Sequence, residues 1–301
     1  MELGVILGLA AAFCWGTADF FARGATRAAS TYLTLLALNG ISTAALLLIF
    51  SPIGQLDFGG ISTGVILAAA GINLAIMSGA ALLYRAFAIG TLSVVSPISA
   101  SFGAVTALLA IITGEHPSLA QSLGIVFALS GVILVSLVPG HPSHAPSHYV
   151  HIGPARFAPG LLEAIASMLI FGVTYWALRY IVDALGGLRT AFVGKVSDFI
   201  VLALIGAVVL ALRGRTGRVS QVRLSRRFVL FVIPNALLDT TANIAYNFGI
   251  TVALTSVVAV LSSLYTAVTV LLAALFLRER LTVWQWGGIL CIFTGIVLVS
   301  L

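Results

Sequence analysis

The sequence predicts an all-α integral membrane protein with ten transmembrane helices in two inverted five-helix repeats. Three observations carry this prediction: the composition is 60% hydrophobic and 8% charged, the apolar residues form long stretches, and the two halves of the chain resemble each other. Soluble domains carry about 25% charged residues. A soluble chain this apolar would expose large adhesive patches, whereas lipid tails solvate an apolar exterior.

Each apolar stretch has about the 20 residues that a spanning helix needs. The stretches run Leu3–Ala22, Tyr32–Phe50, Gly64–Tyr84, Leu92–Ile112, Leu119–Val138, Gly160–Tyr180, Thr190–Leu212, Phe228–Phe248, Leu254–Leu277 and Val283–Leu301. Most connections are short, so consecutive helices should be antiparallel. Backbone groups in lipid must bond within their own segment, and the alternation of barrel strands is absent, so we expect helices.

The longest connection divides the chain nearly in half. It contains Pro139, Pro142, Pro146, Pro154 and Pro159, which disfavour a helix. We therefore expect a first repeat over residues 1–138, a Pro/His-rich linker over 139–159 and a second repeat over 160–301. The linker histidines have no acidic neighbours among the prolines, so no metal is expected at His141, His144, His148 and His151. Neither Cys14 nor Cys291 belongs to a metal or disulfide motif, and no cofactor is expected.

The two halves match at polar and glycine positions. Ser93–Ala110 and Ser256–Ala273 are identical at ten of eighteen positions, at an offset of 163. Upstream, at an offset of 162, Asn73 and Tyr84 match Asn235 and Tyr246; downstream, at 164, the matches are Glu115, Gln121, Gly124, Gly131 and Ser136 with Glu279, Gln285, Gly288, Gly295 and Ser300. Five helices per copy is an odd number, so tandem copies must insert with opposite orientations, as an inverted repeat.

Arginines divide unevenly between the two faces. Twelve lie in the connections of one face, namely Arg23, Arg27, Arg85, Arg156, Arg213, Arg215, Arg218, Arg223, Arg226, Arg227, Arg278 and Arg280, against Arg179 and Arg189 on the other. This bias predicts a multi-pass protein of the cytoplasmic membrane with both termini outside. Half of the twelve lie in Arg213–Arg227, which is also compatible with binding anionic lipid headgroups. Because the bases sit in short connections, the net charge of +6 does not indicate a nucleic-acid partner.

Several short motifs together resemble one family. They are Trp15-Gly16, the run from Tyr84 through Ser96-Pro97 to Glu115, and Arg278-Glu279-Arg280-Leu281-Thr282 followed by Gly288 and Gly295. In order and spacing the chain resembles the EamA-like branch of the drug/metabolite transporter superfamily. The first copy departs from the pattern, since His116-Pro117-Ser118 follows Glu115. The resemblance implies a carrier of small metabolites, amino acids among them, and many members export their substrates.

Ionisable residues inside the predicted spans are the natural functional candidates, because each costs about 2.5–3.5 kcal/mol on insertion scales. In the eighth span Asn235, Asp239, Asn243 and Asn247 recur every four residues and share one face. The stripe fits either a solvated cavity or interhelical hydrogen bonding; the charge of Asp239 favours the cavity. Met77 and Ala81 occupy the positions of Asp239 and Asn243 in the first copy, so the cavity should be asymmetric.

Other spans add further candidates. Lys195 and Asp198 lie three apart and are each other's obvious partner, as a structural ion pair or a gating element. In the first span Asp19 lies between Trp15 and Arg23; Trp15 offers a flat face to a solute or packs in the core. Glu163 is expected at the interface. Pro97 frees backbone carbonyls, either as a hinge or as a static kink.

The substrate-binding set predicted from the sequence is Trp15, Asn73, Tyr84, Ser96, Asn235, Asp239, Asn243, Tyr246, Ser262 and Tyr265. The coupling or gating set is Asp19, Lys195, Asp198 and Pro97. The leading hypothesis is a secondary transporter, an exporter, that moves a small metabolite by alternating access. A channel-like facilitator is the alternative, although nothing resembles a selectivity ring. An enzyme is not expected, because all five histidines lie outside the predicted spans.

Overall fold

The computed structural model describes residues 2–52, 54–90, 92–136, 150–152, 155–157, 159–214, 225–277 and 283–300. The helices of this part are α1 (Glu2–Ala28), α2 (Thr31–Phe50), α3 (Thr63–Ile89), α4 (Leu92–Ala100), α5 (Phe102–Ile112), α6 (Leu119–Ser136), α7 (Leu161–Leu185), α8 (Gly187–Gly214), α9 (Arg226–Val252), α10 (Thr255–Ser263), α11 (Tyr265–Leu277) and α12 (Val283–Ser300). A two-stranded antiparallel hairpin, β1 (Val150–Ile152) and β2 (Ala155–Phe157), precedes α7.

These helices form ten membrane-crossing units, because α4 with α5 and α10 with α11 each make one broken span. Six of them (α1, α2, α3, α7, α8 and α9) are long and apolar enough to span a membrane singly, and the remaining helices are shorter and apolar. The predicted all-α membrane architecture is therefore confirmed. Several helices outrun their predicted ends: α1 and α3 have 27 residues each, about 40 Å at 1.5 Å per residue.

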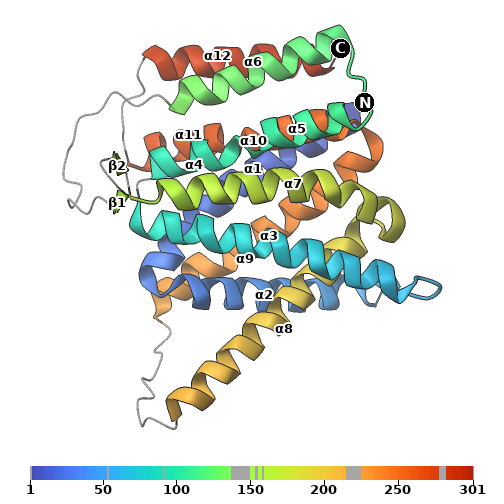
Figure 1. Cartoon of the computed structure of the whole chain (residues 1–301), viewed down its shortest axis with the longest axis vertical. Helices are drawn as coiled ribbons and strands as arrows, with labels where there is room; N and C mark the ends of the chain where they lie inside the picture. Colours follow the sequence, from blue (N-terminus) through green and yellow to red (C-terminus); the bar gives the residue numbers. More distant parts are fainter. Residues whose placement is uncertain are drawn as a thin grey trace.

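The two halves are arranged upside down relative to each other. Figure 1 shows both termini at one end of the bundle, where α1 begins, whereas α7 begins at the opposite end beside the hairpin. Packing is reciprocal: α1 packs on α9 as α7 packs on α3, and α2 meets α9 as α8 meets α3. A two-fold axis that exchanges the halves requires this reciprocity, since a contact between one element and its partner must recur with the roles exchanged.

Close backbone contact holds the central helix α1 in place. A Cβ added at Gly16 would lie 2.5 Å from the carbonyl oxygen of Tyr265 in α11. The Thr269 hydroxyl donates to the Gly16 carbonyl at 3.2 Å. Small residues let helices approach in this way where lipid supplies no hydrophobic driving force between them. α1 thereby packs on α9, α10 and α11 of the other half.

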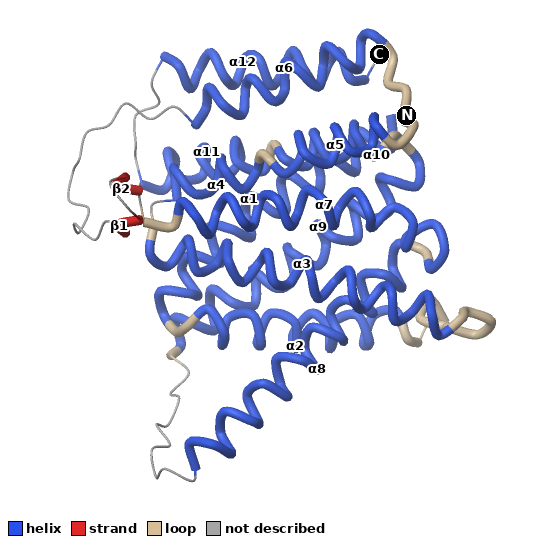
Figure 2. Tube along the Cα trace, in the orientation of Figure 1, coloured by secondary structure: helices blue, strands red, loops and turns tan. Residues whose placement is uncertain are grey.

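The pair α6 and α12 forms an outer layer that lies above the other helices in Figures 1 and 2. A Cβ at Gly124 would lie 2.8 Å from the carbonyl oxygen of Gly295, and one at Gly131 would lie 2.7 Å from that of Gly288. These are the glycines that the repeat alignment pairs as Gly124 with Gly288 and Gly131 with Gly295. Each glycine thus meets the counterpart of the other, as the two-fold relation demands.

The fourth span (α4 and α5) and the ninth span (α10 and α11) differ in sequence near their bends, but both break at equivalent positions. α4 ends before Ser101 and α10 ends before Leu264, 163 residues later. The Ser101 amide donates to the Ile98 carbonyl and the Leu264 amide to the Leu261 carbonyl, both at 3.2 Å, so each bend is closed by a tighter i to i−3 turn. The second copy has Val260 where the first has Pro97, so proline is not the shared cause of the break.

Some sequence-based predictions fall outside the described residues. They concern most of the linker with His141, His144 and His148, residues 215–224 of the Arg-rich connection, the motif Arg278-Glu279-Arg280-Leu281-Thr282, and the side chain of Pro97. Within the linker, His151 lies in β1. No helix was expected in the linker, and its described residues form a short β-hairpin, β1 with β2.

Candidate functional site

A central cavity lies between the two halves. It has a volume of about 80 Å³, on a scale where one water takes roughly 10–15 Å³. Helices of both repeats line it: α1, α2, α3 and α5 from the first, and α7, α8, α9 and α11 from the second. Its polar lining residues are Trp15, Asp19, Asn39, Asn73, Tyr84, Tyr175, Lys195, Asp198, Asp239, Asn243, Asn247 and Tyr265. The space suits several waters or one small solute.

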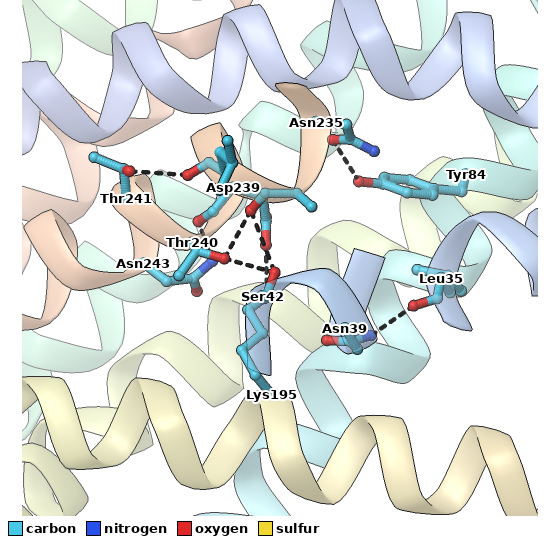
Figure 3. Close-up of polar contacts among 12 residues, drawn as sticks. Leu35, Asn39, Ser42, Tyr84, Lys195, Asn235, Asp239, Thr240, Thr241 and Asn243 are labelled. Carbon is cyan, nitrogen blue, oxygen red and sulfur yellow. Dashed lines mark hydrogen bonds and ion pairs between the residues drawn. The ribbon is translucent and has the colours of Figure 1, made fainter. Parts of the chain in front are cut away.

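An ion pair between α8 and α9 forms part of the wall of this cavity. Figure 3 shows the Lys195 side chain reaching Asp239, and its Nζ donates to Asp239 Oδ2 at 2.5 Å. The expected pair of Lys195 with Asp198 is therefore wrong. A lysine that precedes its acid on a helix is the less favourable order, and Asp239 approaches from the facing helix. Both side chains are largely buried, with 11% and 19% exposed, which strengthens their attraction.

Asparagine amides line the same wall in fixed orientations. Asn39 Nδ2 donates to the Leu35 carbonyl at 3.0 Å and Asn243 Nδ2 to the Asp239 carbonyl at 2.7 Å (Figure 3). Asn73 does the same to Ala69 at 2.8 Å. A carbonyl oxygen only accepts, so the amide nitrogen must face it, and this fixes which end of the amide is which. The oxygen of each amide is left for another donor.

Two further carboxylates belong to the cavity wall. Asp19 of α1 and Asp198 of α8 are each 7% exposed. Asp19 Oδ2 and Asp198 Oδ1 are buried and have no hydrogen-bond partner within the described part of the chain. A buried acceptor without a donor costs about 1–3 kcal/mol, and more when it is charged. A ligand that donates a hydrogen bond to either oxygen would therefore remove this cost.

Aromatic rings form another part of the cavity wall. Trp15 and Tyr175 lie 5.4 Å apart between ring centroids, and Tyr175 and Phe102 lie 5.1 Å apart. Phe171 and Tyr265 extend the cluster at 5.8 Å from Tyr175 and 6.4 Å from Phe102. These separations and tilts lie in the range that aromatic pairs prefer. The cavity is thus amphipathic, with α2, α8 and α9 supplying the polar side and α5, α7 and α11 the aromatic side.

The sequence profile of the EamA-like transporter family matches two segments, residues 2–137 and 158–301. The chain belongs to the EamA-like transporter family. It is accordingly a multi-pass membrane protein that moves small molecules by secondary transport, and its family is one of transporters and not of enzymes. The resemblance drawn from the short sequence motifs is confirmed.

Solved structures agree with the fold of this EamA-like transporter. One crystal structure superposes with a TM-score of 0.71, covering 100% of this chain and 97% of the other at 16% sequence identity. At that identity the likeness shows the fold alone. None of the curated proteins matches the sequence.

Of the predicted substrate-binding set, part lies on the cavity wall of the transporter. The lining residues from that set are Trp15, Asn73, Tyr84, Asp239, Asn243 and Tyr265. From the coupling or gating set Asp19, Lys195 and Asp198 also line it. The predicted asymmetry holds for charge, since the second repeat supplies Lys195, Asp198 and Asp239 and the first supplies Asp19. Met77, which the repeat alignment pairs with Asp239, also lines the cavity.

The structure places the other four predicted residues in helix packing, away from the cavity lining. Asn235 accepts from the Tyr84 hydroxyl at 3.3 Å. Tyr246 is fully buried, with its ring 4.9 Å from Tyr175. Ser96 and Thr266 hydroxyls meet at 3.4 Å between α4 and α11. Ser262 donates to the Ala259 carbonyl one turn back, at 3.0 Å.

Sequence reasoning omitted three polar lining residues, Asn39, Tyr175 and Asn247, from the binding set. Asn39 stands alone as an amide in the span Tyr32–Phe50, and this signal was available. Asn247 belongs to the polar stripe that predicted the cavity. Tyr175 gave no signal, because a tyrosine within a span is equally typical of packing or of a membrane interface.

A second, more open pocket of about 250 Å³ lies at the bundle end that holds the termini. Its wall includes Glu115, Trp176, Arg179 and Asp183. Arg179 pairs with Asp183 at 2.8 Å, and Glu115 accepts from the amides of Thr255 and Ser256 at 2.8 and 2.9 Å. At the opposite end, Arg85 and Glu163 join α3 to α7 at 3.4 Å. Glu163 is thus near a helix terminus, as expected of an interfacial residue.

Proposed function

We propose that this EamA-like transporter exports a small metabolite, in the size range of an amino acid or a related compound, by alternating access through the central cavity. The observation that carries the proposal is the cavity itself, since residues of both repeats line it and four of them are charged, namely Asp19, Lys195, Asp198 and Asp239. Buried charge inside a membrane is expensive and is typical of a solute or ion pathway. We take Asp239 and Lys195 as the pair whose partners change during transport.

The inverted repeat supports alternating access. The two halves share one fold and are inserted in opposite orientations, so each half can adopt the conformation of the other. The equivalent breaks at Ser101 and Leu264 and the reciprocal packing of α1 on α9 and α7 on α3 provide matched moving parts. Exchange of the two conformations opens the cavity first to one side and then to the other.

A ligand screen followed by transport measurements tests this function. Purified full-length protein is screened by thermal shift against a metabolite library, and the hits are measured for uptake and counterflow in liposomes. We expect saturable counterflow of at least one hit, with Asp239→Asn lowering the rate at least tenfold and altering its dependence on pH. Unchanged flux of Asp239→Asn across the pH range would remove this residue from the mechanism.

A channel-like facilitator is the second candidate function, and the same liposomes separate it from a carrier. A carrier returns loaded and therefore gives counterflow, in which unlabelled solute on one side drives labelled solute against its gradient. A channel equilibrates both and gives none. Flux that neither saturates nor shows counterflow would replace the carrier with a facilitator.

We further propose that both termini lie outside the cytoplasmic membrane. Arg23 and Arg27 lie near the end of α1 and Arg85 lies near the end of α3. Both helices end on the side of the bundle opposite the termini (Figure 1), and the arginine-rich side of a membrane protein stays in the cytoplasm. A reporter fused after Leu301 that is active only outside the cytoplasm should give signal. Activity of a cytoplasm-restricted reporter at the same position would reverse the orientation. The proposed division into repeats at 1–138 and 160–301 is compatible with either result.

A further inference from the structure

We infer that the central cavity selects a protonated amine, meaning an organic cation with several N–H donors on an apolar or aromatic body. This inference rests on the proposed function, because it names the class of solute that the same cavity binds. It is carried by the hydrogen-bonding state of the wall, by its charge and by the placement of its rings.

The first step is the chemistry of the unpartnered atoms. Among residues that line the cavity, the buried polar atoms without a partner in the described chain are Asp19 Oδ2, Asn39 Oδ1, Asp198 Oδ1 and Asn247 Oδ1. All are acceptors. Geometry assigns the two amide oxygens, since Asn39 Nδ2 donates to Leu35 O and Asn247 Nδ2 to Gly187 O, both at 3.0 Å. A ligand that satisfies this wall must bring donors, and an ammonium brings three.

Charge points the same way. The lining residues include three carboxylates, Asp19, Asp198 and Asp239, and one ammonium, Lys195. Their formal sum is therefore 1 − 3 = −2, and Lys195 is already bound to Asp239 at 2.5 Å. A solute carboxylate would find its one lining cation occupied and two further acids beside it. A cation instead compensates the excess negative charge, which a low-dielectric site strongly favours.

The aromatic wall completes the match. Trp15 in α1 lies four residues before Asp19, one helical turn away, so an indole face and a carboxylate belong to the same stretch of wall. Tyr175 and Phe102 stand beside Trp15, with centroids 5.4 and 6.3 Å from it. Aromatic faces attract cations and also bury an apolar body. An amine on an aromatic or branched alkyl body fits both surfaces at once.

A matched set of ligands tests the inference without knowledge of the natural substrate. Tryptamine, tryptophan and indole-3-propionate share one ring and carry a cation, a zwitterion and an anion; phenethylamine, phenylalanine and 3-phenylpropionate do the same for a smaller ring. Binding to the purified full-length transporter is measured by thermal shift and by competition. We expect the amine of each set to bind at least tenfold more tightly than the zwitterion, and the anion not to compete.

Variants of the two unpartnered acids localise the effect. Asp19→Asn and Asp198→Asn keep the side-chain shape and remove one charge each, so each should weaken amine binding about tenfold; Asp57→Asn, in an exposed loop, should not. Equal or tighter binding of the anion or zwitterion would overturn the inference, as would the absence of binding by every amine. If the asparagine variants are unstable, the wild-type ligand series decides alone. Counterflow of a neutral or anionic solute would leave the proposed carrier function intact while excluding this substrate class.

Discussion

At the scale of single residues, the Lys195–Asp239 pair decides how the centre of the transporter is charged. The lysine comes from α8 and the acid from α9, 44 residues apart, and their contact neutralises one acid of the cavity. Asp19 and Asp198 have no such cation in contact within the described residues. The cavity wall therefore contains one acid that is paired with a lysine, Asp239, and two acids, Asp19 and Asp198, without a cation in contact in the described part of the chain.

Breaking this pair should be more harmful than removing it. Lys195→Met and Asp239→Asn each leave one member of the pair buried without the other, at a cost of roughly 3–5 kcal/mol, whereas the double variant removes both members. We expect both single variants to melt clearly below the wild type in detergent and the double variant to recover part of the loss. Thermal unfolding of all three checks this.

The exposed pair Arg179–Asp183 is the matched control for that experiment. Its side chains are 35% and 50% exposed, so removing either should cost at most about 1 kcal/mol. Additive losses in the Lys195 and Asp239 double variant would mean that the two side chains do not stabilise each other, which would contradict their ion pair.

At the scale of elements, Glu115 ties the α5–α6 connection to the start of α10. Its two carboxylate oxygens accept from the backbone amides of Thr255 and Ser256. These amides belong to the first turn of α10, where no intrahelical acceptor exists and where negative charge is favoured by the helix dipole.

Glu115→Ala should therefore loosen the start of α10. Hydrogen bonds to a charged group are worth about 1.5–3 kcal/mol, so amide exchange at the beginning of α10 should become faster by at least tenfold. Glu115→Gln keeps one acceptor oxygen, so its exchange rate at the start of α10 should lie between those of the wild type and Glu115→Ala. Hydrogen–deuterium exchange of the peptide that covers Thr255–Ser263 is the measurement, and unchanged protection in Glu115→Ala would contradict the capping role.

The broken fourth span makes a separate prediction. Because α10 and α11 break at Leu264 with Val260 in place of proline, the bend at Ser101 should survive Pro97→Val. We expect this variant to transport within about twofold of the wild type. A loss of transport with normal folding would show that Pro97 is a hinge in its own right, with a function that the second copy lacks.

At the scale of the whole molecule, the two-fold relation is most direct where α6 meets α12. The contacts of Gly124 with Gly295 and of Gly131 with Gly288 bring the backbones together across the axis. In this layer the last helix of the first repeat packs against the last helix of the second.

A single added methyl group should disturb this layer at one glycine and not at another. In Gly131→Ala the Cβ would lie 2.7 Å from Gly288 O, whereas at Gly287 nothing lies within 4 Å. We expect Gly131→Ala to lose about 1–3 kcal/mol through overpacking and Gly287→Ala to be neutral or slightly stabilising. Melting temperatures in detergent compare the two, and equal effects would argue against close contact in this layer.

Much of this architecture followed from the sequence alone. Helix number, the paired halves and their opposite orientation are properties of local composition and of odd-numbered repeats, because a bilayer requires about 20 apolar residues per span and leaves the backbone no partner outside its own segment. The polar stripe of Asn235, Asp239, Asn243 and Asn247 likewise placed a polar face on α9, since a four-residue spacing fixes a face whatever surrounds it.

Only the tertiary structure decided which side chains contact one another across that face. Spacing along a helix predicted that Lys195 pairs with Asp198, but the facing helix brings Asp239 nearer. The tertiary structure also places Asn235 and Tyr246 in helix packing, whereas Asn39 and Tyr175 line the cavity. Periodicity determines the direction of a side chain relative to its own helix; the partner depends on the rotation and depth of the neighbouring helices. Those are set by contacts such as Gly16 on Tyr265 and Gly131 on Gly288, which join residues more than 150 positions apart and which local sequence cannot encode.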